Sequence, residues 1–455
     1  MSKYVYKMTI EEKKAFNIQF WHFLWASILI GLSACLGSVV DAMIVGNLID
    51  EDSVSAINLS LPFLQFMFTV NMLLATGAGM LVGMELGRND TRRASYIFTI
   101  SMMACLVASL VFSACGFFFP DASTRLLCSS EEIFEPTRTY LQIAMITAPV
   151  YMIMWCLDTM VSVDGSPRLV SISILIDNAV HIVLDIVFIR YMGWGIEGSA
   201  WAAVIGHVVG ITMMLFHFFS AKNNLRLTFR SDIKNMFSTL KELVSQGAPL
   251  AIASICLTLM LLSSNHIIVS SLGRMGIFAF SLCMNLLLIY NLFLTGVCRT
   301  IQSLGSIQVG KGDNEGFTLV LRKSFYFITV AMVITSIVVW IWPEVIVMLF
   351  GADKPDLVAQ ACHALRIFSL NCIFFCYIYA IMIVYKLCNY HKIALFISFA
   401  LSLTVIPVLW LFSQYAKEWI WYGFLTAYLI EMVVIFVLHK TTHVKFELKR
   451  GYNFS

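Results

Sequence analysis

Four long stretches of the chain contain no Asp, Glu, Lys or Arg: residues 54–84, 94–120, 243–273 and 393–416. Each is longer than the roughly 20 residues that an α-helix needs to cross about 30 Å of hydrocarbon. Only 13% of the 455 residues are charged and 59% are hydrophobic, whereas about a quarter of the residues of a soluble protein are charged. Inside a bilayer a helix satisfies its own backbone hydrogen bonds. The sequence therefore predicts an all-α membrane protein.

Apolar runs between charged or Gly/Pro-rich breaks predict twelve transmembrane helices. The expected ranges are 18–48, 53–84, 94–119, 137–160, 168–190, 197–220, 241–272, 276–308, 322–343, 358–385, 392–415 and 418–439. An even number of helices puts both termini on one side, and most Lys and Arg residues lie on that side. The opposite loops hold only Arg125, Arg138, Arg190, Arg274, Lys354 and Lys417. This bias predicts a multi-pass protein of the cell (inner) membrane with both termini in the cytoplasm.

The second half of the chain repeats the first. One constant displacement along the sequence brings 87–90 (Gly-Arg-Asn-Asp) onto 310–313 (Gly-Lys-Gly-Asp), and Pro120 onto Pro343. Two copies of six helices share one membrane orientation, which is typical of secondary transporters. The sequence predicts two pseudo-symmetric six-helix lobes at 1–220 and 241–440. A cytoplasmic linker at 221–240 would join them, and 441–455 would form a cytoplasmic tail.

Ionisable side chains within the apolar spans are candidates for function, because each is costly in hydrocarbon. In the fifth helix Asp177, His181 and Asp185 recur every four residues on one face, with Asn178 beside them. Asp41 stands about 10 Å inside the outer end of the first helix at 1.5 Å per residue. Carboxylates facing one cavity repel when both are ionised, so a proton or Na⁺ would bind between them. Alternatively, either aspartate lies in the wet interface or caps a neighbouring helix.

Other polar residues within the spans are weaker candidates. Asn58, Gln65 and Arg299 are assigned to a substrate cavity, although Arg299 or Arg366 could instead form a structural ion pair with Glu431. Four histidines are assigned to packing or to the membrane interface: His22, His207, His217 and His266.

The chain lacks the G-x-x-x-x-G-K-S/T loop of nucleotide-binding proteins, so an ion gradient would drive transport. We expect no catalytic residue, metal or cofactor other than the coupling ion. The expected partners are small organic substrates and the lipid bilayer, with no nucleic acid, and the expected state is a monomer.

Several motifs, taken in order, resemble the multidrug and toxic compound extrusion (MATE) family. They lie at 41–46, 56–62, 86–90, 164–168, 181–185 and 193–203. The resemblance extends over about residues 20–440 and implies twelve helices in two six-helix lobes. It also implies that the chain is no enzyme but exports amphipathic, often cationic, compounds in exchange for Na⁺ or protons.

The resemblance also assigns individual residues. Asp41 matches the family's aspartate in helix 1 and Asp185 its aspartate in helix 5, both part of the cation site of the N-terminal lobe. His181 stands where the family usually has Asn, and Ala203 where Thr is common. A titratable imidazole favours protons over Na⁺. Helices 7 and 10 lack a carboxylate within their apolar spans, so the pattern is nearer the DinF-like than the NorM-like branch.

The expected function is therefore secondary active multidrug efflux through alternating access, driven by proton or Na⁺ antiport. An alternative from the same superfamily is a flippase or exporter of lipid-linked precursors. It would need a large cationic groove, to which Arg299 and Arg366 could contribute. A receptor or scaffold without transport activity is disfavoured by the intramembrane carboxylates and by the duplication.

Overall fold

The computed structural model describes residues 10–49, 51–127, 133–228, 233–349 and 355–441, and every regular element in these ranges is helical. In α1 (Ile10–Leu48) and α2 (Glu51–Asn71) the backbone is described throughout. Some side chains of these two helices, including those of Asp41 and Asn58, lie outside the described residues.

The membrane spans follow the prediction. Eleven helices in the described ranges are long and apolar enough to cross a membrane, and a bent pair forms a twelfth span. The pair consists of α6 (Phe134–Ile146) and α7 (Ala148–Val163), which meet at 54°. Pro149 lies in the first turn of α7, where a missing N–H is tolerated and the preceding helix has to end. The all-α, twelve-helix fold predicted from the sequence is confirmed.

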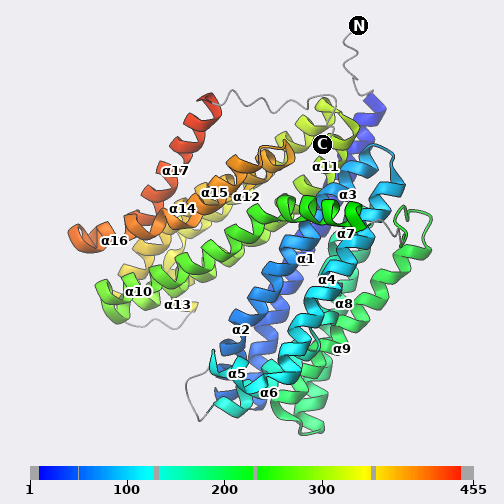
Figure 1. Cartoon of the computed structure of the whole chain (residues 1–455). Helices are drawn as coiled ribbons and strands as arrows, with labels where there is room; N and C mark the ends of the chain where they lie inside the picture. The colour runs from blue at the N-terminus through cyan, green and yellow to red at the C-terminus, as the bar shows by residue number, and fades with distance from the viewer. Residues whose placement is uncertain (1–9, 50, 128–132, 229–232, 350–354, 442–455) are drawn as a thin grey trace. The chain divides into compact units, whose positions relative to one another are not determined.

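The helices divide into two compact units. The N-terminal unit is Asn17–Gly247. Besides α1 from Asn17 onward, α2, α6 and α7, it contains α3 (Gly77–Gly87), α4 (Thr91–Phe118), α5 (Pro120–Arg125), α8 (Pro167–Asp185) and α9 (Gly195–Leu215), with short helical turns at Met72–Thr76, Ile186–Tyr191 and Phe216–Phe219. Helices α8 and α9 form its most extensive helix pair, and α4 packs against α7 (Figure 1).

The C-terminal unit is Ala248–Ser455 together with Met1–Phe16. Its helices are α10 (Ile233–Thr300, which begins in the other unit), α11 (Ser306–Lys311), α12 (Asn314–Ile341), α13 (Pro343–Leu349), α14 (Pro355–Leu387), α15 (His391–Leu403), α16 (Val405–Tyr415) and α17 (Trp421–Thr441), with turns at Ile301–Gly305 and Lys417–Trp419. Gly273 has φ 62° and ψ −146° within α10, a conformation that glycine adopts readily. It separates the seventh and eighth predicted spans. Helix α17 packs against α14 and α16.

The start of α4 and its counterpart α12 show the duplication in three dimensions. Helices α4 and α12 each contain 28 residues. Asp90 caps α4 and Asp313 caps α12, each accepting a hydrogen bond from the backbone N–H three residues further on, at 2.9 and 3.0 Å. Both caps follow a residue with positive φ, Asn89 at 62° and Gly312 at 67°. The displacement seen in the sequence therefore links structurally equivalent turns.

A second pair of turns corresponds at a slightly larger displacement, which matches Asp164 with Cys388. The turn between α7 and α8 contains Gly165 at φ 95°, and the turn between α14 and α15 contains Asn389 at φ 64°. Backbone hydrogen bonds match across the two turns: Asp164 N–H to Met160 and Cys388 N–H to Val384 have equivalent positions. The two turns are therefore equivalent positions of the repeat.

Candidate functional site

Helix α8 presents three ionisable side chains on one face. Asp177 is 3% exposed and Asp185 is fully buried, while His181 lies between them and is partly buried. The helix begins at Pro167 and contains no further Pro and no Gly before Asp185, so its period keeps residues four apart on one side. The carboxylates predicted as ion-coupling residues are thus withdrawn from solvent within a membrane span.

Asp177 pairs with a histidine of the next helix. The Nδ1 atom of His207, on α9, lies 3.1 Å from Oδ1 and 3.0 Å from Oδ2 of Asp177. The ring of Tyr151, on α7, meets the His207 ring edge-on at 4.6 Å between centroids. Three helices therefore fix this imidazole. The sequence alone assigns His207 to packing or to the interface, and the structure gives it a carboxylate partner.

Two glycines on α9 allow this close contact. A Cβ atom at Gly206 would lie 2.6 Å from Oδ1 and 2.9 Å from the backbone oxygen of Asp177. One turn further, a Cβ atom at Gly210 would lie 3.3 Å from the Cβ of Asp177. Small residues four apart let helices approach closely in membranes. The spacing of the two glycines is visible in the sequence, but it indicates close helix packing and does not identify the polar partner.

A second histidine–carboxylate contact lies further along α8, where His181 is one turn and Asp185 two turns after Asp177. The Nε2 atom of His181 is 3.4 Å from Oδ2 of Asp185. The His181 side chain is 16% exposed and that of Asp185 is 0% exposed. Helix α8 thus contributes to two histidine–carboxylate pairs, one within itself and one with α9.

Asn178 connects α8 to α1. Its amide Nδ2 donates to the hydroxyl of Ser33 at 2.8 Å, and Ser171 Oγ donates to the backbone oxygen of Ala26 at 2.8 Å. Both contacts join residues that are 145 positions apart, so α1 and α8 run parallel in a constant register. The same register places residue 41 of α1 at the level of Asp185. The Asp41 side chain itself lies outside the described residues, and its assignment remains a prediction.

The remaining predicted residues fall in both units. Gln65 is exposed on α2 of the N-terminal unit, and Arg299 is partly buried near the end of α10 in the C-terminal unit. The side chain of Asn58 lies outside the described residues. Their assignment to a substrate cavity stays a prediction.

The C-terminal unit carries an apolar face where α8 is polar. The displacement that matches Asp164 with Cys388 maps the three ionisable residues of α8 onto Leu401, Val405 and Leu409, which are at most 1% exposed. The histidine–carboxylate arrangement of α8 therefore belongs to the first copy of the repeat.

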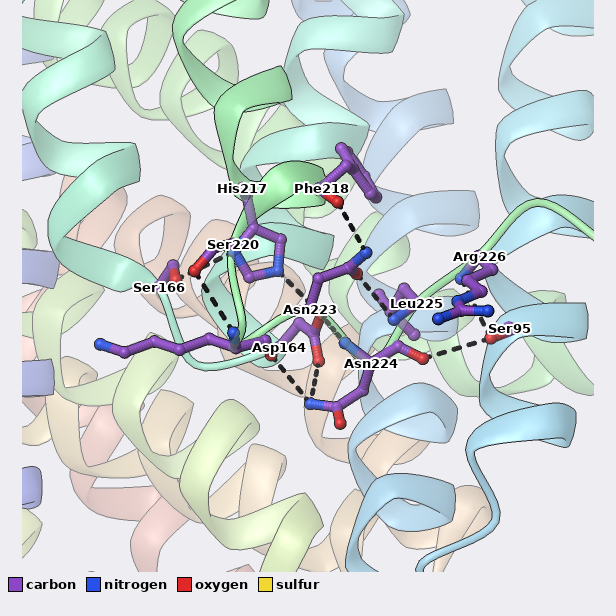
Figure 2. Close-up of polar contacts among 11 residues, drawn as sticks. Ser95, Asp164, Ser166, His217, Phe218, Ser220, Asn223, Asn224, Leu225 and Arg226 are labelled. Carbon is purple, nitrogen blue, oxygen red and sulfur yellow. Dashed lines mark hydrogen bonds and ion pairs between the residues drawn. The ribbon is translucent and has the colours of Figure 1, made fainter.

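A further buried polar cluster surrounds Asp164 at the turn between α7 and α8. Its carboxylate accepts hydrogen bonds from Nε2 of His217 at 2.8 Å and from the backbone and side-chain nitrogens of Asn224, each at 2.9 Å. Nδ1 of His217 lies 2.9 Å from the hydroxyl of Ser166. The side chains of Asp164 and His217 are both 0% exposed. Figure 2 shows these side chains converging on the carboxylate.

This cluster fixes the chain that follows α9. Backbone N–H groups of Arg226 and Thr228 continue the attachment by donating to the hydroxyls of Ser95 and Thr99 on α4, at 3.1 and 2.9 Å. Within the expected linker 221–240, residues 223–228 are thus non-helical but bonded to the N-terminal unit, and α10 begins at Ile233. The role of His217 could not be seen in the sequence, because its partner lies 53 residues away.

Comparison with known proteins places this architecture in a family. The model of the MatE family matches the chain twice, at residues 25–187 and 249–411. The multidrug export protein MepA of Staphylococcus haemolyticus is 22% identical over 367 residues, which cover 78% of each chain. MepA of Staphylococcus aureus (strain MSSA476) is 22% identical over 348 residues, covering 76% of each.

Solved structures share the fold. A MATE protein in its bent conformation has a TM-score of 0.84 at 15% identity, with 94% of this chain and 95% of the other covered. A MOP superfamily transporter from Pyrococcus furiosus, whose binding pocket is described as having reverse polarity, has a TM-score of 0.82 at 15% identity, with 93% and 95% covered. The two family matches are related by the same displacement that matches Asp164 with Cys388, and together they span most of the chain. The chain therefore belongs to the MatE family of multi-pass membrane transporters.

Proposed function

We propose that this chain is a secondary active multidrug efflux transporter, which exports small, amphipathic and often cationic organic compounds in exchange for protons by alternating access. The observation that carries the proposal is the arrangement of two histidine–carboxylate pairs, Asp177–His207 and His181–Asp185, inside the membrane spans of the N-terminal unit. The curated relatives are named as multidrug export proteins, which supports the same substrate class.

The chemistry of such a pair suits exchange. A neutral imidazole beside a carboxylate leaves one net negative charge, which is unfavourable away from water. One added proton removes this charge, because the imidazolium then balances the carboxylate. An organic cation would also balance it. Since proton and cation neutralise the same charge, binding of one disfavours the other, which is the requirement for antiport.

Histidine favours the proton as the coupling ion. Its unperturbed pKa of about 6.5 lets it change charge near physiological pH, whereas Na⁺ prefers oxygen ligands alone. Membrane topology is part of the proposal: the Lys and Arg bias supports cytoplasmic termini and a location in the cell membrane. The cationic substrate would then leave the cytoplasm as protons enter.

Transport in vesicles tests the proposal. The purified full chain would be reconstituted with ethidium, a fluorescent organic cation, and exposed separately to a pH step and to a Na⁺ step. We expect the pH step to drive ethidium movement and the Na⁺ step not to. Asp177→Asn, Asp185→Asn and Asp41→Asn should each abolish the pH-driven movement. Glu197→Gln, which changes an exposed carboxylate in the first turn of α9, is the matched control and should transport normally.

Each contrary result has a distinct meaning. Movement driven by Na⁺ alone would replace the proton as coupling ion, and full activity of all three Asn variants would remove the coupling site from these residues. Translocation of a fluorescent lipid without ethidium transport would favour the flippase alternative. His181→Asn should shift the pH profile of transport between about pH 5 and 8. An unchanged profile would reduce His181 to a packing residue.

A further inference from the structure

Glu431 occupies the middle of α17 in the C-terminal unit. Helix α17 extends from Trp421 to Thr441, so the glutamate lies midway along a 21-residue membrane span. Glu431 is 2% exposed. At 1.5 Å per residue, both ends of the helix are about 15 Å away. The carboxyl group is thus as remote from both membrane surfaces as this helix allows.

The carboxyl group has no polar partner among the described residues. Both of its oxygens are buried without a hydrogen bond to any residue that the structure describes. The ion pair with Arg299 or Arg366 that the sequence left open is therefore not formed. An isolated ionised carboxylate is strongly disfavoured in such surroundings, and the neutral acid is favoured instead.

The register of α14 against α17 explains why no basic residue of α14 reaches Glu431. The ring of Phe375 packs against that of Tyr428, and Tyr385 contacts His439 at 3.1 Å. These contacts run parallel along the two helices and place Glu431 level with residues 377 and 378 of α14. At 1.5 Å per residue, Arg366 lies about 17 Å and Lys386 about 13 Å along the axis from that level.

The titratable groups that face this part of α17 are neutral side chains. Tyr428 lies one turn before Glu431, and Cys372 and Cys376 of α14 are close to the same tyrosine. The Tyr428 hydroxyl donates to the sulfur of Met260 on α10. From α15 and α16, the titratable residues are His391, Lys392 and Tyr415, all at helix ends. No described cation therefore balances an ionised Glu431.

We propose that Glu431 is a proton-binding site of the C-terminal unit, occupied in the present conformation and emptied when water reaches the middle of α17. On binding, one carboxylate oxygen forms an O–H bond with a proton taken from water, and the glutamate becomes neutral. On release, that bond breaks and the proton returns to water. This site goes beyond the proposed function of the N-terminal pairs, and its occupancy can be measured without transport.

Infrared difference spectroscopy tests the site directly. The purified full chain in lipid vesicles would be held at about pH 7, where an ordinary glutamate is ionised, and then brought stepwise to about pH 9. We expect a protonated-carboxyl band at the lower pH that disappears reversibly as the pH rises. Glu431→Gln should lack the band, and Glu344→Gln, which changes an exposed carboxylate at the start of α13, should retain it.

A band identical in wild type and Glu431→Gln would overturn the proposal, and so would a Glu431 band that never titrates, because the group would then be a permanently neutral packing residue. If Glu431→Gln fails to fold, Glu431→Asp decides instead, since a carboxyl at that site must shift the band. Asp177→Asn/Asp185→Asn should keep the Glu431 band while losing pH-driven transport. That double variant separates failure of this inference from failure of the proposed function.

Discussion

Replacing Gly206 by alanine should separate α8 from α9 at the Asp177–His207 pair. The added methyl group would lie 2.6 Å from Oδ1 and 2.9 Å from the backbone oxygen of Asp177, whereas ordinary contacts begin at 3.4 Å. The side-chain oxygen could turn away, but the backbone oxygen belongs to α8 itself. Helix α9 therefore has to retreat by several tenths of an ångström.

The expected cost has two parts. Overpacking of a close-packed interior costs about 1–3 kcal/mol. The retreat also lengthens the contacts between His207 and Asp177, which are 3.0 and 3.1 Å, and loss of a hydrogen bond to a charged group costs about 1.5–3 kcal/mol. Because the contact is lengthened and not removed, we take the lower end of both ranges, which predicts a destabilisation of about 3 kcal/mol, or roughly 6–12 °C in the unfolding midpoint of a unit of this size.

Thermal unfolding of the purified variants, followed by vesicle transport, measures both consequences. Gly210→Ala is the matched control one turn away, because its methyl group would meet Asp177 Cβ at 3.3 Å and the flexible Met154 side chain at 3.4 Å. We expect that variant to lose less than about 1 kcal/mol and to keep its transport activity. Gly206→Ala should lose pH-driven transport along with stability.

Equal midpoints for Gly206→Ala and Gly210→Ala would refute the reasoning, because the two glycines differ in how closely they approach Asp177. A destabilised Gly206→Ala that still transports with an unchanged pH profile would show that the Asp177–His207 contact is structural. The packing argument would then stand, and the coupling role of this pair would fail.

Three further predictions concern other parts of the chain. His217→Ala removes a 2.8 Å hydrogen bond from the fully buried side chain of Asp164. The free energy of unfolding should fall by about 2 kcal/mol, and residues 218–228 should become sensitive to limited proteolysis. Unchanged cleavage would contradict the anchoring role of His217. Asp90→Ala and Asp313→Ala each remove a helix cap and should each lower the unfolding free energy by about 1 kcal/mol, and very unequal losses in thermal unfolding would contradict their equivalence. Burial raises the pKa of the Cys388 thiol to about 12 because the thiolate is disfavoured. At about pH 8 a maleimide should therefore label Cys388 only after denaturation, whereas a free cysteine of pKa about 8.5 would react. Mass spectrometry of the labelled peptide measures the labelling. Rapid labelling of the folded chain would contradict the burial argument.

The fold could be predicted from the sequence because a bilayer imposes simple requirements. A span needs about 20 apolar residues, and the breaks between spans show as charged or Gly/Pro-rich segments. The bend between α6 and α7 also has a visible cause in Pro149. The repeat could be found because turn residues such as Asp90 and Asp313 hold their places in both copies.

The partners of the polar residues could not be predicted in the same way. Spacing along α8 groups Asp177, His181 and Asp185, but the partner of Asp177 depends on the rotation of α9 about its axis, which packing at Gly206 determines. The possible ion pair between Glu431 and an arginine was wrong for a related reason. The level of Glu431 relative to α14 follows from a ring contact between Phe375 and Tyr428, which are far apart in the sequence. The local sequence shows which residues form one helix, whereas the rotation of that helix about its axis and its level relative to its neighbours depend on tertiary packing.

The matched lengths of α4 and α12 bear on the history of the chain. If the two copies arose from one ancestral gene segment, neither has gained or lost a residue between its capping aspartate and the end of its 28-residue helix. A single insertion would rotate every later side chain by about 100° and turn buried positions toward lipid. Substitutions have meanwhile changed the interior freely, from Asp177 in one copy to Leu401 in the other. Natural variants of this chain should therefore differ in the chemistry of the interior much more often than in the length of these two helices.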